Sequence, residues 1–147
     1  SYFCSVPLTG PKKKVIFFHS FVKKHSRCQP RVVGPLQPVV ATLGDDVVIQ
    51  CHLKPSLDVE AETVEWSRPD LEPDLSDRLS RIEYVHVHRD HGEFVDMKMA
   101  AYVGRTMMFV EEMKHGNISL KIVNVTMTDQ GVYRCYVPKC VLWTLLI

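Results

Sequence analysis

Three histidines near the middle of the chain have the side-chain chemistry of metal ligands. His86, His88 and His91 form a His-x-His-x-x-His pattern, and alternate residues of a β-strand point to the same face. Imidazole nitrogens bind zinc, and a turn after His88 could swing the third ring toward the first two. No Cys, Asp or Glu is obviously placed as a fourth ligand, and histidines on a solvent-facing hairpin are common. We therefore predict no metal site and no cofactor.

Other residue patterns that carry chemistry are absent from the sequence or weak. There is no Gly-x-Ser-x-Gly elbow, no His-Glu-x-x-His and no phosphate-binding glycine loop, so the sequence predicts a protein that is not an enzyme. Lys12 to Lys14 and Lys23-Lys24 could contact anionic lipid or nucleic acid. Short basic runs are usually just solvated, and the net charge of the chain is only +1. We expect no nucleic-acid partner.

Five cysteines favour an oxidising compartment. They lack the Cys-x-x-Cys spacing typical of zinc sites, so disulfide bonding is the better interpretation. Any of the five could be unpaired and the other four can pair in three ways, which leaves fifteen schemes. Two glycosylation sequons, which begin at Asn117 and Asn124, fit the same secretory route.

Length and composition indicate one globular domain. The chain has 147 residues, of which 46% are hydrophobic and 24% charged. Its apolar runs, such as Val15 to Phe18 and Val141 to Ile147, are far shorter than the roughly 20 residues that cross a bilayer. The chain as given is therefore not expected to span a membrane.

From Val32 onward, short β-branched and aromatic runs alternate with turn residues, which predicts about eight strands and no long helix. The clearest alternation is at residues 47–53, where every second residue is apolar. Asp90-His91-Gly92 predicts a hairpin turn into a strand at Phe94 to Met97. Before that turn, the pattern predicts that Val85 and Val87 point inward and that His86 and His88 face solvent.

The decisive pattern lies near the end of the chain. Asp129-Gln130-Gly131-Val132-Tyr133-Arg134-Cys135 contains an intact Asp-x-Gly-x-Tyr-x-Cys motif, and Cys51 and Trp66 precede it at the spacing of an antiparallel sandwich. Here the chain resembles the immunoglobulin V-set. The stretch from Tyr102 to Thr106, followed by residues 116–125, is similar more narrowly to butyrophilins and myelin oligodendrocyte glycoprotein.

The resemblance implies an all-β immunoglobulin V-type sandwich and assigns structural roles to six residues. It implies a disulfide between Cys51 and Cys135, with Trp66 and Tyr133 in the core beside it. It also implies an ion pair between Arg105 and Asp129. Cys4, Cys28 and Cys140 are then expected to be free or mispaired.

The resemblance covers residues 31–139 and leaves both ends without a counterpart. Residues 1–30 form an unassigned basic segment. After Cys135 the sequence has no glycine of the kind that usually opens the last strand, the G strand. We expect this strand to be incomplete or replaced, with residues 140–147 as a remnant or an atypical G strand.

As to function, the resemblance implies an ectodomain fragment on the extracellular side of the plasma membrane, with its membrane anchor outside this chain. It implies a butyrophilin-like module that binds a protein receptor on another cell and modulates T-cell receptor signalling and cytokine production. The alternative is homophilic adhesion of the myelin glycoprotein type. We expect partner binding on the sheet that contains Trp66, through His86, His88, Arg89 and His91, and glycans at Asn117 and Asn124 on the opposite side.

Overall fold

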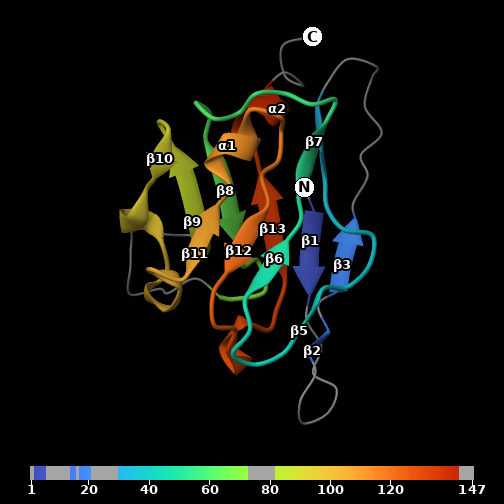
Figure 1. Cartoon of the computed structure of the whole chain (residues 1–147), viewed down its shortest axis with the longest axis vertical. Coiled ribbons are helices and arrows are strands. Elements are labelled where there is room, and N and C mark those ends of the chain that lie inside the picture. Colours follow the sequence, from blue (N-terminus) through green and yellow to red (C-terminus); the bar gives the residue numbers. More distant parts are fainter. Residues whose placement is uncertain (1, 6–13, 16, 21–29, 73–81, 143–147) are drawn as a thin grey trace.

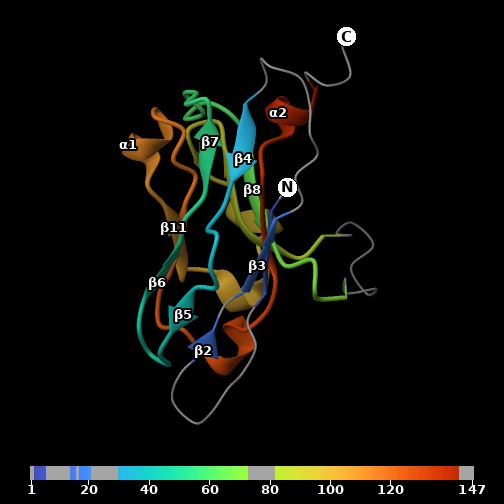
Figure 2. The ribbon, with the colours of Figure 1, turned by 90° about the vertical axis from the view of Figure 1, so that its right-hand side faces the viewer.

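A computed structural model describes residues 2–5, 14–15, 17–20, 30–72 and 82–142. Their two larger β-sheets face each other, and two separate two-stranded sheets accompany them (Figures 1 and 2). The strands of these ranges are β1 (Tyr2–Ser5), β2 (Lys14–Val15), β3 (Phe17–Ser20), β4 (Arg31–Val33), β5 (Val40–Ala41), β6 (Val47–Ile49), β7 (His52–Lys54), β8 (Val64–Ser67), β9 (Tyr84–Arg89), β10 (Gly92–Glu93), β11 (Thr106–Met108), β12 (Leu120–Ile122) and β13 (Tyr133–Tyr136). The short helices are α1 (Val110–Met113) and α2 (Pro138–Leu142), with 3-10 turns η1 (Val95–Met97), η2 (Ala100–Tyr102) and η3 (Met127–Asp129).

The larger sheet has six strands in the order β10-β9-β8-β13-β1-β3, and every neighbouring pair is antiparallel. The facing sheet has the order β11-β12-β6, and β7 continues the path of β6 to pair with β4. Figure 2 shows the two layers edge-on, with β6 and β11 in one and β8 and β3 in the other. The strand alternation predicted for residues 47–53 is observed, because the odd-numbered positions are buried and the even-numbered ones exposed.

The core between the sheets is built around a disulfide. Cys51, just before β7, is bonded to Cys135 in β13, as the resemblance implied. Trp66 is fully buried in β8, and its indole Nε1 donates a hydrogen bond of 2.9 Å to the carbonyl of Ile118. The disulfide and the tryptophan thus join the two sheets at their centre.

The hairpin predicted at Asp90 to Gly92 forms between β9 and β10, with Asp90 and His91 at positive φ. The prediction of a strand from Phe94 to Met97 is wrong, because residues 95–97 form the 3-10 turn η1.

The two ends of the chain meet the larger sheet in different ways. The N-terminal segment without a counterpart in the resemblance contributes β1 and β3 to this sheet, and β1 lies directly beside β13 (Figure 1). After β13 the chain enters α2, so residues 140–142 are helical, and residues 143–147 lie outside the described residues. Cys140 is a free thiol, whereas Cys28 and the basic residues 12, 13, 23 and 24 also lie outside the described residues.

Candidate functional site

His86 and His88 are buried, and the prediction that they face solvent is wrong. They are 3% and 1% exposed. His86 lies opposite Trp66 and His88 lies opposite Val64 in the β8–β9 ladder. Directly opposed residues of antiparallel strands project from the same face, so both imidazoles point inward with Trp66 and Val64.

Both histidines have polar partners inside the domain. His86 Nδ1 lies 2.9 Å from Thr106 Oγ1 and 3.5 Å from a carboxylate oxygen of Glu93, and His88 Nε2 lies 2.6 Å from the carbonyl oxygen of Glu60. The ammonium of Lys98 is buried in the same cluster, where it contacts Thr106 Oγ1 at 2.7 Å and Glu93. Buried polar groups with such partners support the fold rather than recognition.

The other two residues predicted to contact a partner, Arg89 and His91, lie at the hairpin tip. Their side chains are 57% and 65% exposed. Arg89 approaches Asp90 at 3.7 Å and His91 approaches Glu60 at 3.8 Å, distances typical of weak surface ion pairs. Of the four predicted contact residues, the structure therefore leaves these two accessible.

The outer face of the larger sheet has a different set of side chains at its centre. Tyr136 lies opposite Glu65, and the guanidinium of Arg134 stacks on the Tyr136 ring with its carbon 4.6 Å from the ring centroid. A register shift after Trp66 places Tyr84 opposite Ser67, on this same face. We call Glu65, Tyr84, Arg134 and Tyr136 the outer-face cluster.

The outer-face cluster is partly buried, since Tyr84 is 8% exposed and Glu65, Arg134 and Tyr136 are half-buried. Burial raises the pKa of Glu65, while the positive charge of Arg134 opposes this shift. Burial also raises the pKa of Tyr84. Arg134 Nε is buried and has no hydrogen-bond partner among the described residues. Arg and Tyr are enriched in protein interfaces, and here an Arg and a Tyr side chain stack on each other on a half-buried sheet face.

The predicted pair of Arg105 and Asp129 lies at one end of the sandwich. Their side chains form two hydrogen bonds, Nη2 to Oδ2 at 2.6 Å and Nη1 to Oδ1 at 3.2 Å. Asp129 also accepts the backbone N–H of Thr126, which caps η3, and its own carbonyl accepts the Tyr133 hydroxyl. The hydrogen bond to Asp129 raises the pKa of Arg105. The pair therefore ties η3 to the turn before β11.

We expect Arg105→Met and Asp129→Asn to be coupled in a double-mutant cycle by about 1–3 kcal/mol, because each single change leaves a partly buried charge without its partner. Asparagine keeps an acceptor for the Thr126 N–H. Chemical denaturation of the four proteins measures the coupling. If the loss of stability in the double variant equals the sum of the two single losses, the interaction between Arg105 and Asp129 contributes nothing to the free energy of unfolding.

A second arginine, which the sequence analysis did not single out, lies at the centre of a polar network. Arg68 is 3% exposed and forms two parallel hydrogen bonds to Asp70, at 2.8 and 2.9 Å. It also donates to the Tyr102 hydroxyl and the Gln130 carbonyl, each at 2.7 Å, and stacks on the Tyr133 ring. Burial opposes its charge, but the bonds to Asp70 prevail and raise the pKa of Arg68.

This network explains the glycine in the Asp-x-Gly-x-Tyr-x-Cys motif. A Cβ added at Gly131 would overlap the guanidinium of Arg68 and the carboxylate of Asp70. Position 131 must therefore lack a side chain so that the Arg68–Asp70 pair can pack against the backbone.

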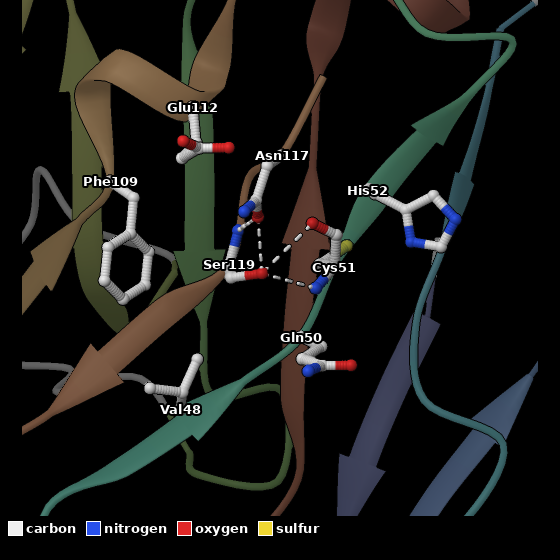
Figure 3. A pocket seen from close by; sticks show the side chains of 8 residues that line it. All are labelled: Val48, Gln50, Cys51, His52, Phe109, Glu112, Asn117 and Ser119. Atoms are coloured by element: carbon white, nitrogen blue, oxygen red, sulfur yellow. Dashed lines mark hydrogen bonds between the residues drawn. The ribbon is translucent and has the colours of Figure 1, made fainter. Parts of the chain in front are cut away.

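The sequons lie on the other sheet, at the two ends of β12. Asn117 borders an open groove of about 460 Å³ together with Gln50, Phe109 and Glu112 (Figure 3). Its Oδ1 accepts hydrogen bonds from the backbone and hydroxyl of Ser119, at 3.0 and 2.6 Å. Asn124 is exposed at positive φ. Neither asparagine lies near the outer-face cluster, which belongs to the opposite sheet.

Together, the facing sheets, the Cys51–Cys135 disulfide and Trp66 define an immunoglobulin-type β-sandwich. The sequence matches the immunoglobulin V-set domain family over residues 35–142, and the chain belongs to this family. Within it, the chain is a butyrophilin-like V-set domain with both butyrophilin and myelin glycoprotein homologues.

Three comparisons support that placement. The chain is 35% identical over 105 residues to mouse butyrophilin subfamily 2 member A2, covering 71% of this chain and 18% of that protein. It is 32% identical over 108 residues to myelin-oligodendrocyte glycoprotein of Macaca fascicularis, covering 74% of this chain and 40% of that protein. The crystal structure of bovine butyrophilin superimposes with a TM-score of 0.59 at 25% identity, over 74% of this chain and 46% of that one. The chain thus spans less than half the length of these relatives.

This family is not enzymatic, and the chain is accordingly a non-catalytic module. Within the described ranges, no helix has the length and apolar character needed to cross a bilayer.

Proposed function

We propose that this domain is the extracellular receptor-binding module of a butyrophilin-like membrane protein, and that it modulates T-cell receptor signalling and cytokine production. Its place would be the extracellular side of the plasma membrane, with a membrane anchor outside residues 1–147. The similarity to butyrophilins supports the proposal, because a V-set domain of this kind offers a broad sheet face rather than a catalytic pocket.

The observation that carries the proposal is the outer-face cluster. It replaces His86 and His88, which are buried, as the expected contact surface, and Arg89 and His91 at the hairpin tip remain exposed. Tyr136, Arg134 and Glu65 combine aromatic area with charges of both signs, which suits recognition of a protein surface. Glycans at Asn117 and Asn124 would cover the opposite sheet and leave this face open.

The test is staining of activated T cells with a fluorescent tetramer of the domain, followed by cytokine release on plates coated with it. We expect Glu65→Arg combined with Tyr136→Ala to lower staining and the cytokine effect at least tenfold, because interface anchors of this type each contribute about 1–2 kcal/mol or more. Lys121→Ala, on the opposite sheet, is the matched control. If the outer-face variant and Lys121→Ala stain T cells equally, the contact lies elsewhere on the domain. Full staining by a domain with Asn117→Gln and Asn124→Gln would show that the glycans are not what the T cells bind.

Homophilic adhesion is the second candidate, favoured by the similarity to myelin-oligodendrocyte glycoprotein. Beads coated with the domain distinguish the two functions. Aggregation of beads without cells, abolished by the same outer-face variant, would favour adhesion, whereas dispersed beads and stained T cells would favour receptor binding.

A further inference from the structure

The strand position beside β13 is filled in an unusual way. In a V-set domain the strand that carries the second cysteine, here β13, is flanked on one side by the G strand, which follows it in sequence. Here the chain leaves β13 and forms α2 from Pro138 to Leu142, with the Cys140 N–H bonded to the Val137 carbonyl. The neighbour of β13 is instead β1, from the opposite end of the chain.

The pairing is regular on both sides of β1. Tyr2, Phe3 and Cys4 lie opposite Cys135, Arg134 and Tyr133, and the direction is antiparallel, as it is for a G strand. The other edge of β1 pairs with β3 over four residues (Figure 1). The hairpin of β1 and β3 thus extends the sheet by two strands.

An uncovered β13 would be costly for the domain. Its edge would expose a row of unpaired N–H and C=O groups, which is a template for aggregation. This strand also carries one cysteine of the core disulfide and two members of the outer-face cluster, so its pairing supports both the core and the candidate contact face.

We propose that the segment carrying β1 and β3 is a built-in strand donor, which completes the V-set sheet of the same molecule by occupying the G position. A second contact favours donation within one molecule. Between β1 and β3 in sequence, β2 pairs with β5, where Val15 lies opposite Val40 and Lys14 opposite Ala41, and Ala41 belongs to the core. If two copies exchanged this segment, the β1–β13 pairing and the β2–β5 pairing would both have to form between the copies. This inference does not depend on the identity of the receptor.

A disulfide trap tests which molecule donates the strand. In the full chain with Cys4, Cys28 and Cys140 changed to serine, Phe3→Cys and Arg134→Cys place thiols on opposed residues. Such residues have Cα atoms about 4.5–5.5 Å apart, within the range that a disulfide bridges. After mild oxidation we expect the two introduced thiols to be linked within the monomer, as detected by non-reducing peptide mapping. The matched control, Phe3→Cys with Lys121→Cys on the opposite sheet, should not form a link.

A covalent dimer would overturn the proposal, because the strand would then come from a second copy. A monomer without the link would overturn it as well. Hydrogen exchange of the full chain gives an independent readout: Phe3→Pro, which removes a backbone donor from β1, should accelerate exchange of the amides of residues 133–136 at least tenfold, whereas Phe3→Ala should not. If Phe3→Pro also removes the amide protection of the facing sheet, the donor role is still supported. Equal protection of residues 133–136 in Phe3→Pro and Phe3→Ala would contradict it.

Discussion

Replacing Arg68 with methionine is expected to lower the free energy of unfolding by about 3–5 kcal/mol, which is the cost of breaking a buried ion pair from one side. The substitution preserves much of the apolar volume but removes every donor of the guanidinium. Asp70 loses its two charge-assisted hydrogen bonds, and the Tyr102 hydroxyl and Gln130 carbonyl lose a donor. An effect this large is a substantial part of the roughly 5–15 kcal/mol that typically stabilises a domain.

Denaturant unfolding monitored by tryptophan fluorescence, to which the buried Trp66 contributes, measures the change. Arg89→Met is the matched control, because Arg89 is exposed at the hairpin tip and should change stability by less than about 0.5 kcal/mol. Equal unfolding midpoints for the two variants would show that the Arg68 network does not stabilise the fold.

Part of this architecture could be read from the sequence, because local patterns determine it. The period-two burial of residues 47–53 needs only one apolar face, and the residues from Asp129 to Cys135 identify the strand of the second cysteine. Arg68 was missed although it follows Trp66 by two positions. Its role depends on Tyr102, Thr128 and Gln130, which are 34 to 62 residues away in sequence.

Other features depend on long-range pairing that periodicity does not encode. Residues 84–88 are buried at every position, so alternation could not tell which set points inward. The register with β8 settles this and places His86 and His88 on the side of Trp66. In the same way, nothing in Tyr2 to Ser5 identifies β13 as its partner, because the two strands come from opposite ends of the chain.

The burial of His86 has a consequence for stability at mildly acidic pH. Burial of the ring lowers the pKa of His86 to about 4, with smaller contributions from Lys98 and His88, which also lower it, and from Glu93, which raises it. In the unfolded chain a histidine has a pKa near about 6.5. The neutral ring is therefore the form that the fold accommodates, and protonation favours unfolding.

We expect the free energy of unfolding to be highest above about pH 6.5 and to fall as the pH drops from there toward about 4, with His86 accounting for about 3 kcal/mol of the loss. His86→Gln cannot be protonated in this range, so its stability should depend less on pH than that of the parent. His91→Gln, at an exposed position, should keep the parental dependence. Urea unfolding at pH 7.5, 6, 5 and 4 gives the three curves. If the His86→Gln curve runs parallel to that of the parent, the buried imidazole is not the group that makes this domain acid-sensitive.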